Sequence, residues 1–174
     1  MTAASAPEAR ATVRALVLDA DDRLLLQRYL DPTVRRPGGR PHRVPVWIAP
    51  GGGLAPGETA AAGLERELRE ETGLIGVAWG AWLWRRTVDL HYHGRLLRFV
   101  EHYRLGRVAA AAPRVAPTSL DPQERGALLG HRWWRLSDLR AATEAVYPPR
   151  LAARLAAALP GPPSGAVVDI SHEG

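Results

Sequence analysis

The stretch from Gly52 to Leu74 reads GGLAPGETAAAGLERELREETGL. Its second half predicts a helix with Glu67, Glu70 and Glu71 on one stripe, because positions three and four apart are neighbours on a helix surface. Like charges on one stripe repel each other, so either solvent or a cation must compensate for them. Clustered carboxylate oxygens are ligands that suit Mg²⁺ or Mn²⁺.

The alternative interpretation is a solvated acidic face, which most Glu-rich surface helices carry. The residues ahead of the helix argue against it, because Pro50-Gly51-Gly52-Gly53 and Pro56-Gly57 form a glycine-rich entrance that a surface helix does not need. Glycines let backbone groups approach an ion or a phosphate closely. We expect Thr59 to cap the helix and Gly73 to end it in the left-handed conformation. The buried ridge of this helix should consist of Leu64 and Leu68.

The spacing G-x5-E-x7-R-E-U-x-E-E-x-G-U, where U is apolar, is matched at every fixed position of this stretch and resembles the signature box of the Nudix hydrolases. The resemblance implies an α/β fold, a Nudix-type α/β/α sandwich with a mixed, partly antiparallel sheet. It also implies that water attacks a diphosphate linkage of a nucleotide-type small molecule, with Mg²⁺ (or Mn²⁺) as the cofactor.

The same resemblance implies a role for each box residue. Arg66 would hold Glu67 in place, and Glu58 and Gly52 would lie behind the ligands. The implied metal ligands are the carbonyl of Gly51 and the carboxylates of Glu67, Glu70 and Glu71.

The general base differs among members of this family, so the resemblance leaves it open. Glu67 is one candidate. An acid ahead of the last predicted strand often completes the site in such proteins, and Glu124 occupies a comparable place here. Glu101, on a predicted strand, is a third acid that could reach the metal.

Two features bear on the substrate. The segment 30–45 is either a substrate-facing flap or a solvated basic loop; it carries Arg35, Arg36, Arg40, His42 and Arg43. Past the box, ADP-ribose hydrolases tend to carry a proline and diadenosine polyphosphate hydrolases a tyrosine; this chain has no proline between Leu74 and Pro113, but it has Tyr92. A nucleoside triphosphate or dinucleoside polyphosphate is therefore favoured over ADP-ribose or a nucleotide sugar.

Alternating patterns predict the strands. We expect 12–18 and 23–29 to form a hairpin, 46–49 to lead into the glycine turn, and 76–91 to pair with 95–108 through His93-Gly94. If Tyr92 faces Arg95, then Arg86 faces Glu101. Glu101 would then form an ion pair with Arg86, which we favour, or reach the metal. The same register pairs Leu90 with Leu97, Val88 with Phe99, and Trp84 with Tyr103.

The remaining chain predicts a helix start at 121–124, a strand over 131–136, and a helix that is capped by Ser137 and runs through Ala142. It also predicts an amphipathic helix over 148–159, which either packs on the core or forms a dimer contact. The histidines near the predicted turn are expected to be structural or solvated: His91, His93 and His102. The tryptophans are expected in the core, although one could stack on a base: Trp79, Trp82, Trp84, Trp133 and Trp134.

Composition narrows the function classes further. The 174 residues suffice for one domain, and we expect a Nudix hydrolase domain over 12–159 between flexible segments at 1–11 and 160–174. The absence of cysteine excludes disulfides and thiolate nucleophiles, and the absence of lysine excludes Schiff-base chemistry. The net charge of +5 favours anionic small molecules, and we expect no specific nucleic-acid partner.

No apolar run is long enough to span a bilayer and none resembles a signal peptide, so we expect a cytoplasmic protein. Homodimerisation is open. The competing hypothesis from another class is a non-catalytic Nudix regulator that binds a nucleotide or RNA. Such regulators often lose box acids, whereas every box acid is present here.

Overall fold

A computed structural model describes residues 6–41, 43–160 and 166–172. Over these residues the strands form one eight-stranded mixed sheet in the order β7-β3-β2-β1-β5-β4-β8, with β6 paired to β2. Its strands are β1 (Glu8–Leu18), β2 (Leu24–Tyr29), β3 (Val46–Ile48), β4 (Ala78–Tyr92), β5 (Arg95–Arg107), β6 (Leu128–Trp134), β7 (Ala145–Tyr147) and β8 (Val168–Asp169). Its helices are α1 (Ala60–Thr72), α2 (Pro122–Ala127), α3 (Leu136–Arg140) and α4 (Leu151–Ala158).

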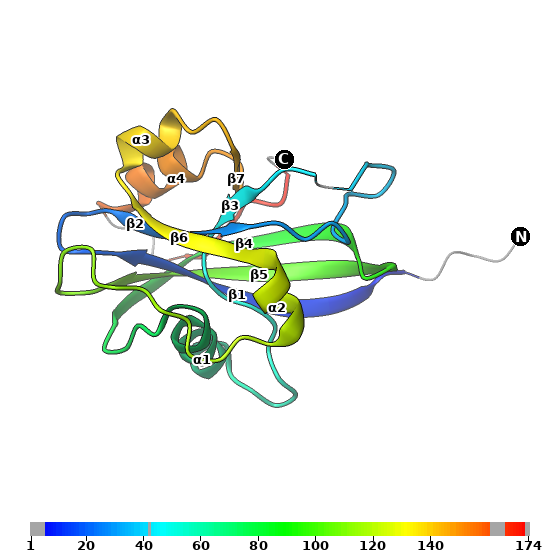
Figure 1. Ribbon diagram of the computed structural model, residues 1–174, viewed down its shortest axis with the longest axis horizontal. Helices are drawn as coiled ribbons and strands as arrows, with labels where there is room; N and C mark the ends of the chain where they lie inside the picture. The colour runs from blue at the N-terminus through cyan, green and yellow to red at the C-terminus, as the bar shows by residue number, and fades with distance from the viewer. Residues whose placement is uncertain (1–5, 42, 161–165, 173–174) are drawn as a thin grey trace, which may run out of the picture.

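The helices cover both faces of the sheet, with α1 on one side and α3 and α4 on the other (Figure 1). Three strand pairs are parallel, β1 with β5, β3 with β7 and β4 with β8, and the other pairs are antiparallel. The predicted α/β/α sandwich with a mixed, partly antiparallel sheet is confirmed.

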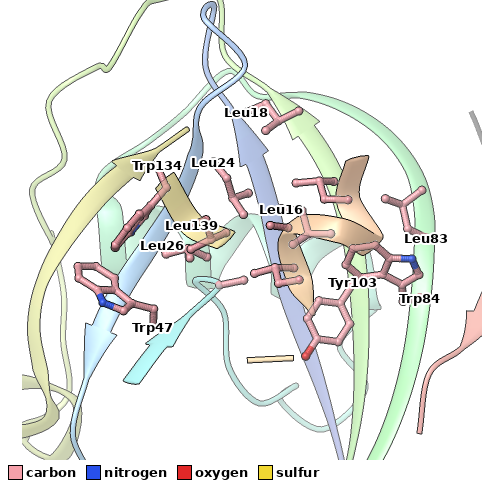
Figure 2. Close-up of a cluster of buried hydrophobic side chains, with 14 of the residues drawn as sticks. Leu16, Leu18, Leu24, Leu26, Trp47, Leu83, Trp84, Tyr103, Trp134 and Leu139 are labelled. Atoms are coloured by element: carbon pink, nitrogen blue, oxygen red, sulfur yellow. The ribbon is translucent and has the colours of Figure 1, made fainter. Parts of the chain in front are cut away.

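Two buried clusters hold the layers together, because neighbouring strand residues point to opposite faces. On one side of β1, Val13, Ala15 and Val17 pack with Leu64 and Leu68 of α1. On the other side a larger cluster joins the sheet to α3 and α4 (Figure 2). Its labelled members include Leu16, Leu24, Trp47, Trp134 and Leu139.

The ends of α1 are as predicted. The Thr59 hydroxyl accepts a hydrogen bond from the backbone of Ala62 at 3.3 Å, and Gly73 adopts the left-handed conformation at φ 71°. The predicted ridge is buried, since Leu64 is 0% and Leu68 1% exposed. The carboxylate stripe therefore faces away from the core.

The predicted register of the long hairpin is also confirmed. Tyr92 pairs with Arg95, and Arg86 pairs with Glu101. The other predicted partners match as well: Leu90 with Leu97, Val88 with Phe99, and Trp84 with Tyr103.

The N-terminal strand differs from the prediction. It begins at Glu8, inside the segment 1–11 expected to be flexible, because its backbone pairs with β5 from Glu8↔Leu97 to Leu18↔Arg107. The predicted hairpin with β2 is reduced to the single pair Leu18↔Leu24. The alternation of side chains along β1 does not indicate which strand it pairs with. The first residues of β1 are exposed, so no apolar pattern marks where the strand begins.

The C-terminal third needs four corrections. β6 ends at Trp134, and α3 begins at Leu136 without a side-chain cap, so Ser137 is not the cap; Leu136 and Leu139 face the core one turn apart and set the start of the helix instead. α3 ends at Arg140 rather than Ala142, and α4 begins at Leu151 rather than Pro148.

The segment after Pro160, expected to be flexible, contributes β8, and Ile170 beyond it is buried and donates its backbone N–H to Arg85 at 2.9 Å. The strand β7, which pairs with β3, was too short to be predicted. Over residues 6–41, 43–160 and 166–172, no helix combines the length and apolar character that crossing a membrane requires.

Candidate active site

A cavity of about 690 Å³ lies between the glycine turn, α1, α2 and the strands β1, β2, β4 and β5. Its lining changes character from one side to the other. The helices supply carboxylates, and the strands supply arginine, aliphatic and aromatic side chains. We call the strand side the sheet wall, which consists of Arg10, Thr12, Arg14, Arg86, Val88, Leu90, Tyr92, Phe99 and Glu101.

Three carboxylates converge at the helix side: Glu67 and Glu71 from α1 and Glu124 from α2. One oxygen of each lies within 4.8 Å of the others. We call these three residues the acid cluster. Glu67 and Glu71 are only 6% and 5% exposed, so water provides little screening. An all-oxygen group of three anions fits a hard divalent cation.

Glu71 is the most buried member of the acid cluster. Its Oε2 accepts the backbone N–H of Gly51 at 2.6 Å, and its Oε1 accepts the side-chain amide of Gln27 at 3.1 Å. Burial outweighs these hydrogen bonds and raises the pKa of Glu71 to about 7, with a further contribution from Glu67. The carboxylate is therefore positioned as a ligand, yet it holds its negative charge weakly without a cation.

Arg66 binds Glu67 as the sequence predicts. Its Nη1 donates to Glu67 Oε1 at 2.9 Å, and its Nε donates to Glu58 Oε1 at 2.8 Å. Its Nη2 also bonds the carbonyl of Gly53 at 3.1 Å. The Arg66 guanidinium lowers the pKa of Glu58 to about 2, whereas burial raises the pKa of Glu67. Glu58 therefore lies behind the cluster and anchors Arg66.

The glycine turn is tight against the same carboxylate. A Cβ on Gly52 would lie 2.7 Å from Glu67 Oε2, so a larger residue there would displace that side chain. A Cβ on Gly51, which has φ 134°, would collide with the Val13 carbonyl. The two glycines thus allow β1, the turn and α1 to approach one another.

Two predicted metal ligands, Glu70 and the Gly51 carbonyl, line the cavity but accept hydrogen bonds from arginines. Glu70 is outside the acid cluster, and its Oε2 accepts Arg66 Nη1 at 3.1 Å, because i and i+4 residues are neighbours on the helix. The carbonyl of Gly51 accepts Arg14 Nη1 at 2.7 Å. The box spacing could not reveal Arg14, because this residue comes from β1.

Glu124 does join the acid cluster, as the sequence suggested. It lies on α2, where its Oε2 accepts the backbone N–H of Asp121 at 2.9 Å. The Asp121 side chain in turn accepts the N–H of Glu124 at 2.8 Å, which completes a reciprocal capping box. This short helix therefore holds Glu124 beside Glu67 and Glu71.

Glu101 takes the ion-pair role that we favoured. Its Oε2 accepts Arg86 Nη1 at 3.0 Å and the Tyr103 hydroxyl at 2.8 Å, and its Oε1 accepts Arg14 Nε at 3.4 Å. It is absent from the acid cluster formed by the described residues. Burial opposes the charge on Arg14, but Glu101, Tyr103 and Glu71 outweigh it and raise the pKa of Arg14.

The predicted substrate residues are divided. Tyr92 and Arg36 line the cavity, whereas Arg35, Arg40 and Arg43 do not. Arg35 instead forms backbone hydrogen bonds with His91, which join the basic segment to β4. His42 lies outside the described residues.

The histidines and tryptophans singled out in the sequence contribute neither a cluster member nor a cavity-lining indole among the described residues. Among the described residues none of His91, His93 and His102 belongs to it, and none of the tryptophans lines the cavity. Trp47, Trp84 and Trp134 are buried in the core. The aromatic rings that do line the cavity belong to Tyr29, Tyr92, Phe99 and Tyr147.

Sequence reasoning missed Arg14, Gln27, Thr12 and Asp31. Arg14 and Thr12 alternate with Val13 and Ala15, so a polar residue at every second position of an otherwise apolar strand was a readable signal. Gln27 is 1% exposed after three leucines, and its Oε1 has no hydrogen-bond partner among the described residues. Asp31, buried behind Tyr29, had no sequence signal.

An α/β/α sandwich in which a glycine turn and a helix present clustered carboxylates beside a cavity is the architecture of a divalent-metal hydrolase. The NUDIX domain family model matches residues 8–155, so the chain belongs to the Nudix family and is an enzyme of the Nudix hydrolase class. Members of this family typically use divalent metals and act on nucleotide-type small molecules. A search of curated protein sequences found no match.

Solved structures share the fold at low identity. The MutT protein from Methanosarcina mazei Go1 is 19% identical with a TM-score of 0.62, over 88% of this chain and 95% of that one. A C. elegans Ap4A hydrolase binary complex is 15% identical with a TM-score of 0.58, over 87% and 98%. A bifunctional NMN adenylyltransferase/ADP ribose pyrophosphatase from Francisella tularensis is 21% identical with a TM-score of 0.55, over 90% of this chain and 42% of that one.

Proposed function

We propose that the protein is a Mg²⁺- or Mn²⁺-dependent pyrophosphohydrolase that cleaves the diphosphate linkage of a nucleoside diphosphate joined to another group. The observation that carries this proposal is the acid cluster of Glu67, Glu71 and Glu124 at one side of a cavity of about 690 Å³. Cavities of this size accommodate nucleotide-sized ligands.

Each residue of the site would have a separate task. Glu67 and Glu71 would ligate the cation, and Arg66 would fix the carboxylate of Glu67 by its hydrogen bond. When bound, divalent cations neutralise phosphate oxygens and lower the pKa of attached water. The carboxylates of this chain would otherwise repel the phosphates.

Glu124 is the favoured general base and Glu67 the alternative. Among the described residues no arginine pairs with Glu124, whereas Arg66 occupies Glu67. Its helix cap holds one carboxylate oxygen, and the other oxygen of the pair remains available beside Glu67 and Glu71. Glu124 would accept the proton that this water loses on attack at phosphorus.

The apolar and aromatic part of the sheet wall would hold the nucleoside of the substrate. Tyr92 and Phe99 pack edge to face with ring centroids 5.9 Å apart, and both line the cavity with Val88 and Leu90. Apolar and aromatic groups of this kind bury a base well. Tyr92, the residue that favours a nucleoside triphosphate or dinucleoside polyphosphate over ADP-ribose or a nucleotide sugar, belongs to this part of the sheet wall.

Product release with Mg²⁺ or Mn²⁺ at mildly alkaline pH tests the proposal across nucleoside triphosphates, dinucleoside polyphosphates, nucleotide sugars and ADP-ribose. We expect one class to be hydrolysed by the wild type and not by Glu71→Gln. Equal rates in both proteins, or no turnover of any compound by folded, metal-bound protein, would contradict it.

A further inference from the structure

A buried charge group in the sheet wall has no role in the chemistry described above. It consists of Arg14 on β1, Arg86 on β4 and Glu101 on β5, and we call it the arginine pair with its shared carboxylate. Glu101 is 7% and Arg86 8% exposed. All three residues line the cavity. Two guanidinium groups share one carboxylate, so one positive charge has no anionic partner within the group.

A buried charge is costly unless something neutralises it. Glu71 offsets part of the charge at the Arg14 side, whereas Glu101 is the one carboxylate bonded to Arg86 among the described residues. Arg86 donates Nη1 to Glu101 at 3.0 Å, and among the described residues its Nε and Nη2 have no hydrogen-bond partner. The neighbouring Tyr103 hydroxyl is used on Glu101 at 2.8 Å and supplies no negative charge. Arg86 is therefore buried, but it lines the cavity, where its Nε and Nη2 donors are available to a ligand.

A single residue, Gly51, is hydrogen-bonded to both this group and the acid cluster. Gly51 donates its N–H to Glu71 Oε2 at 2.6 Å and accepts Arg14 Nη1 on its carbonyl at 2.7 Å. Arg86 joins Arg14 through the shared Glu101, so a ligand in contact with both the acid cluster and Arg86 would carry one anionic group at the cation and a second one at Arg86. Adjacent phosphoryl groups of a phosphoanhydride have this arrangement, and arginine matches phosphate oxygens with two donors.

We propose that Arg86, supported by Arg14 and Glu101, is a phosphate subsite for the phosphoryl group adjacent to the one held at the acid cluster. This inference rests on the proposed function, because it assigns the second phosphate of the same substrate. Glu101 orients Arg86 and limits the excess charge to one unit. The subsite selects substrates in which at least two linked phosphoryl groups enter the cavity.

Calorimetric binding of imidodiphosphate, the non-hydrolysable analogue of pyrophosphate, to the Mg²⁺-loaded protein tests the subsite. We expect Arg86→Gln to weaken imidodiphosphate about tenfold, or about 1.4 kcal/mol, and orthophosphate much less, since one phosphoryl group can occupy the cation alone. Arg85→Gln is the matched control. Arg85 is the preceding residue, points to the other face and pairs with Asp169 at 3.1 Å.

A second variant should change the affinity for imidodiphosphate in the opposite direction, and its result does not depend on whether Arg86→Gln folds. Glu101→Gln removes the shared negative charge, so imidodiphosphate should bind more tightly than to the wild type. The inference is overturned if the Mg²⁺-loaded wild type does not bind imidodiphosphate. It is also overturned if Arg86→Gln affects both anions equally, or if Glu101→Gln weakens binding.

The calorimetric outcomes are separable from failure of the proposed function. Unchanged imidodiphosphate binding in Arg86→Gln, with normal hydrolysis by the wild type, rejects the subsite alone. Binding that depends on Arg86, without hydrolysis of any diphosphate, keeps the subsite and rejects the hydrolase proposal.

Discussion

The acid cluster and the sheet wall face each other across one cavity but are built differently. Glu67 and Glu71 are four residues apart on one helix, and hydrogen bonds from the nearby Arg66 and Gly51 hold them. The sheet wall is drawn from β1, β4 and β5, where strand register aligns its residues and Glu101 bonds Arg14 and Arg86 across the strands. A change in the acid cluster should therefore abolish the chemistry, whereas a change in the sheet wall should alter which ligand binds and how tightly.

The largest expected effect separates two neighbours in the sequence. Glu71→Gln should lower turnover about 10³-fold, because loss of a cation ligand removes several kcal/mol of transition-state stabilisation. Glu70→Gln should stay within about tenfold, since Glu70 bonds Arg66 and not the cluster. Steady-state kinetics at saturating Mg²⁺ measure both. Equal losses of turnover in the two variants would indicate that Glu70 is a metal ligand as well.

Glu71 also makes the stability of the metal-free protein depend on pH. Its pKa rises from 4.5 to about 7 on folding, so its contribution to stability is present below pH 4.5 and is lost as the pH rises through 7. In EDTA at pH 8, Glu71→Gln should exceed the wild type in unfolding free energy by about 3 kcal/mol, with little difference at pH 4.

Urea unfolding at the two pH values measures this difference. Added Mg²⁺ should reverse the order at pH 8, because it binds only the ionised carboxylate of the wild type. A variant that is less stable than the wild type in EDTA at pH 8 would show that burial does not dominate the environment of Glu71.

The third effect concerns the base. Glu124→Gln should reduce turnover about a hundredfold, the lower end for general base catalysis, while Asp138→Asn, an exposed acid on α3 that lies outside the cavity lining, serves as the control. A rate close to the wild type would assign the base to Glu67.

The difference between the acid cluster and the sheet wall also explains which site residues could be predicted from the sequence. The carboxylate stripe depends on helix periodicity and its caps at Thr59 and Gly73 on neighbouring residues, all of which are local in sequence. The link between Arg66 and Glu67 was implied by the family resemblance. The hairpin register followed from one two-residue turn, which placed Arg86 opposite Glu101. Arg14 and the true start of β1 depend on parallel pairing with β5, more than eighty residues away, which no local pattern contains.

The arginine contacts of two predicted metal ligands have a similar explanation. Glu70, but not Glu71, lies four residues after Arg66, so helix periodicity allows the ion pair between Arg66 and Glu70. Gly51 was expected to offer its carbonyl to a cation, and β1 instead brings Arg14 to that oxygen. The first contact lies within α1, whereas the second crosses from β1 to the glycine turn.

The smallest effect tests the basic segment. Arg36 lines the cavity and Arg40 does not, although both are exposed. Arg36→Gln should raise the Michaelis constant roughly threefold, because an exposed charge contributes under about 1 kcal/mol, and Arg40→Gln should leave it unchanged. A similar rise in both would indicate long-range attraction by the net positive charge, which added salt would suppress.

Mn²⁺ binding followed by electron paramagnetic resonance tests the central claim most directly, since it requires no knowledge of the substrate. We predict that the wild type binds Mn²⁺ at mildly alkaline pH, that Glu71→Gln loses most of this affinity, and that Glu70→Gln retains it. Equal affinity in the wild type and Glu71→Gln would contradict the assignment of the acid cluster as the metal site. It would also contradict the assignment of chemistry to the acid cluster and of ligand binding to the sheet wall.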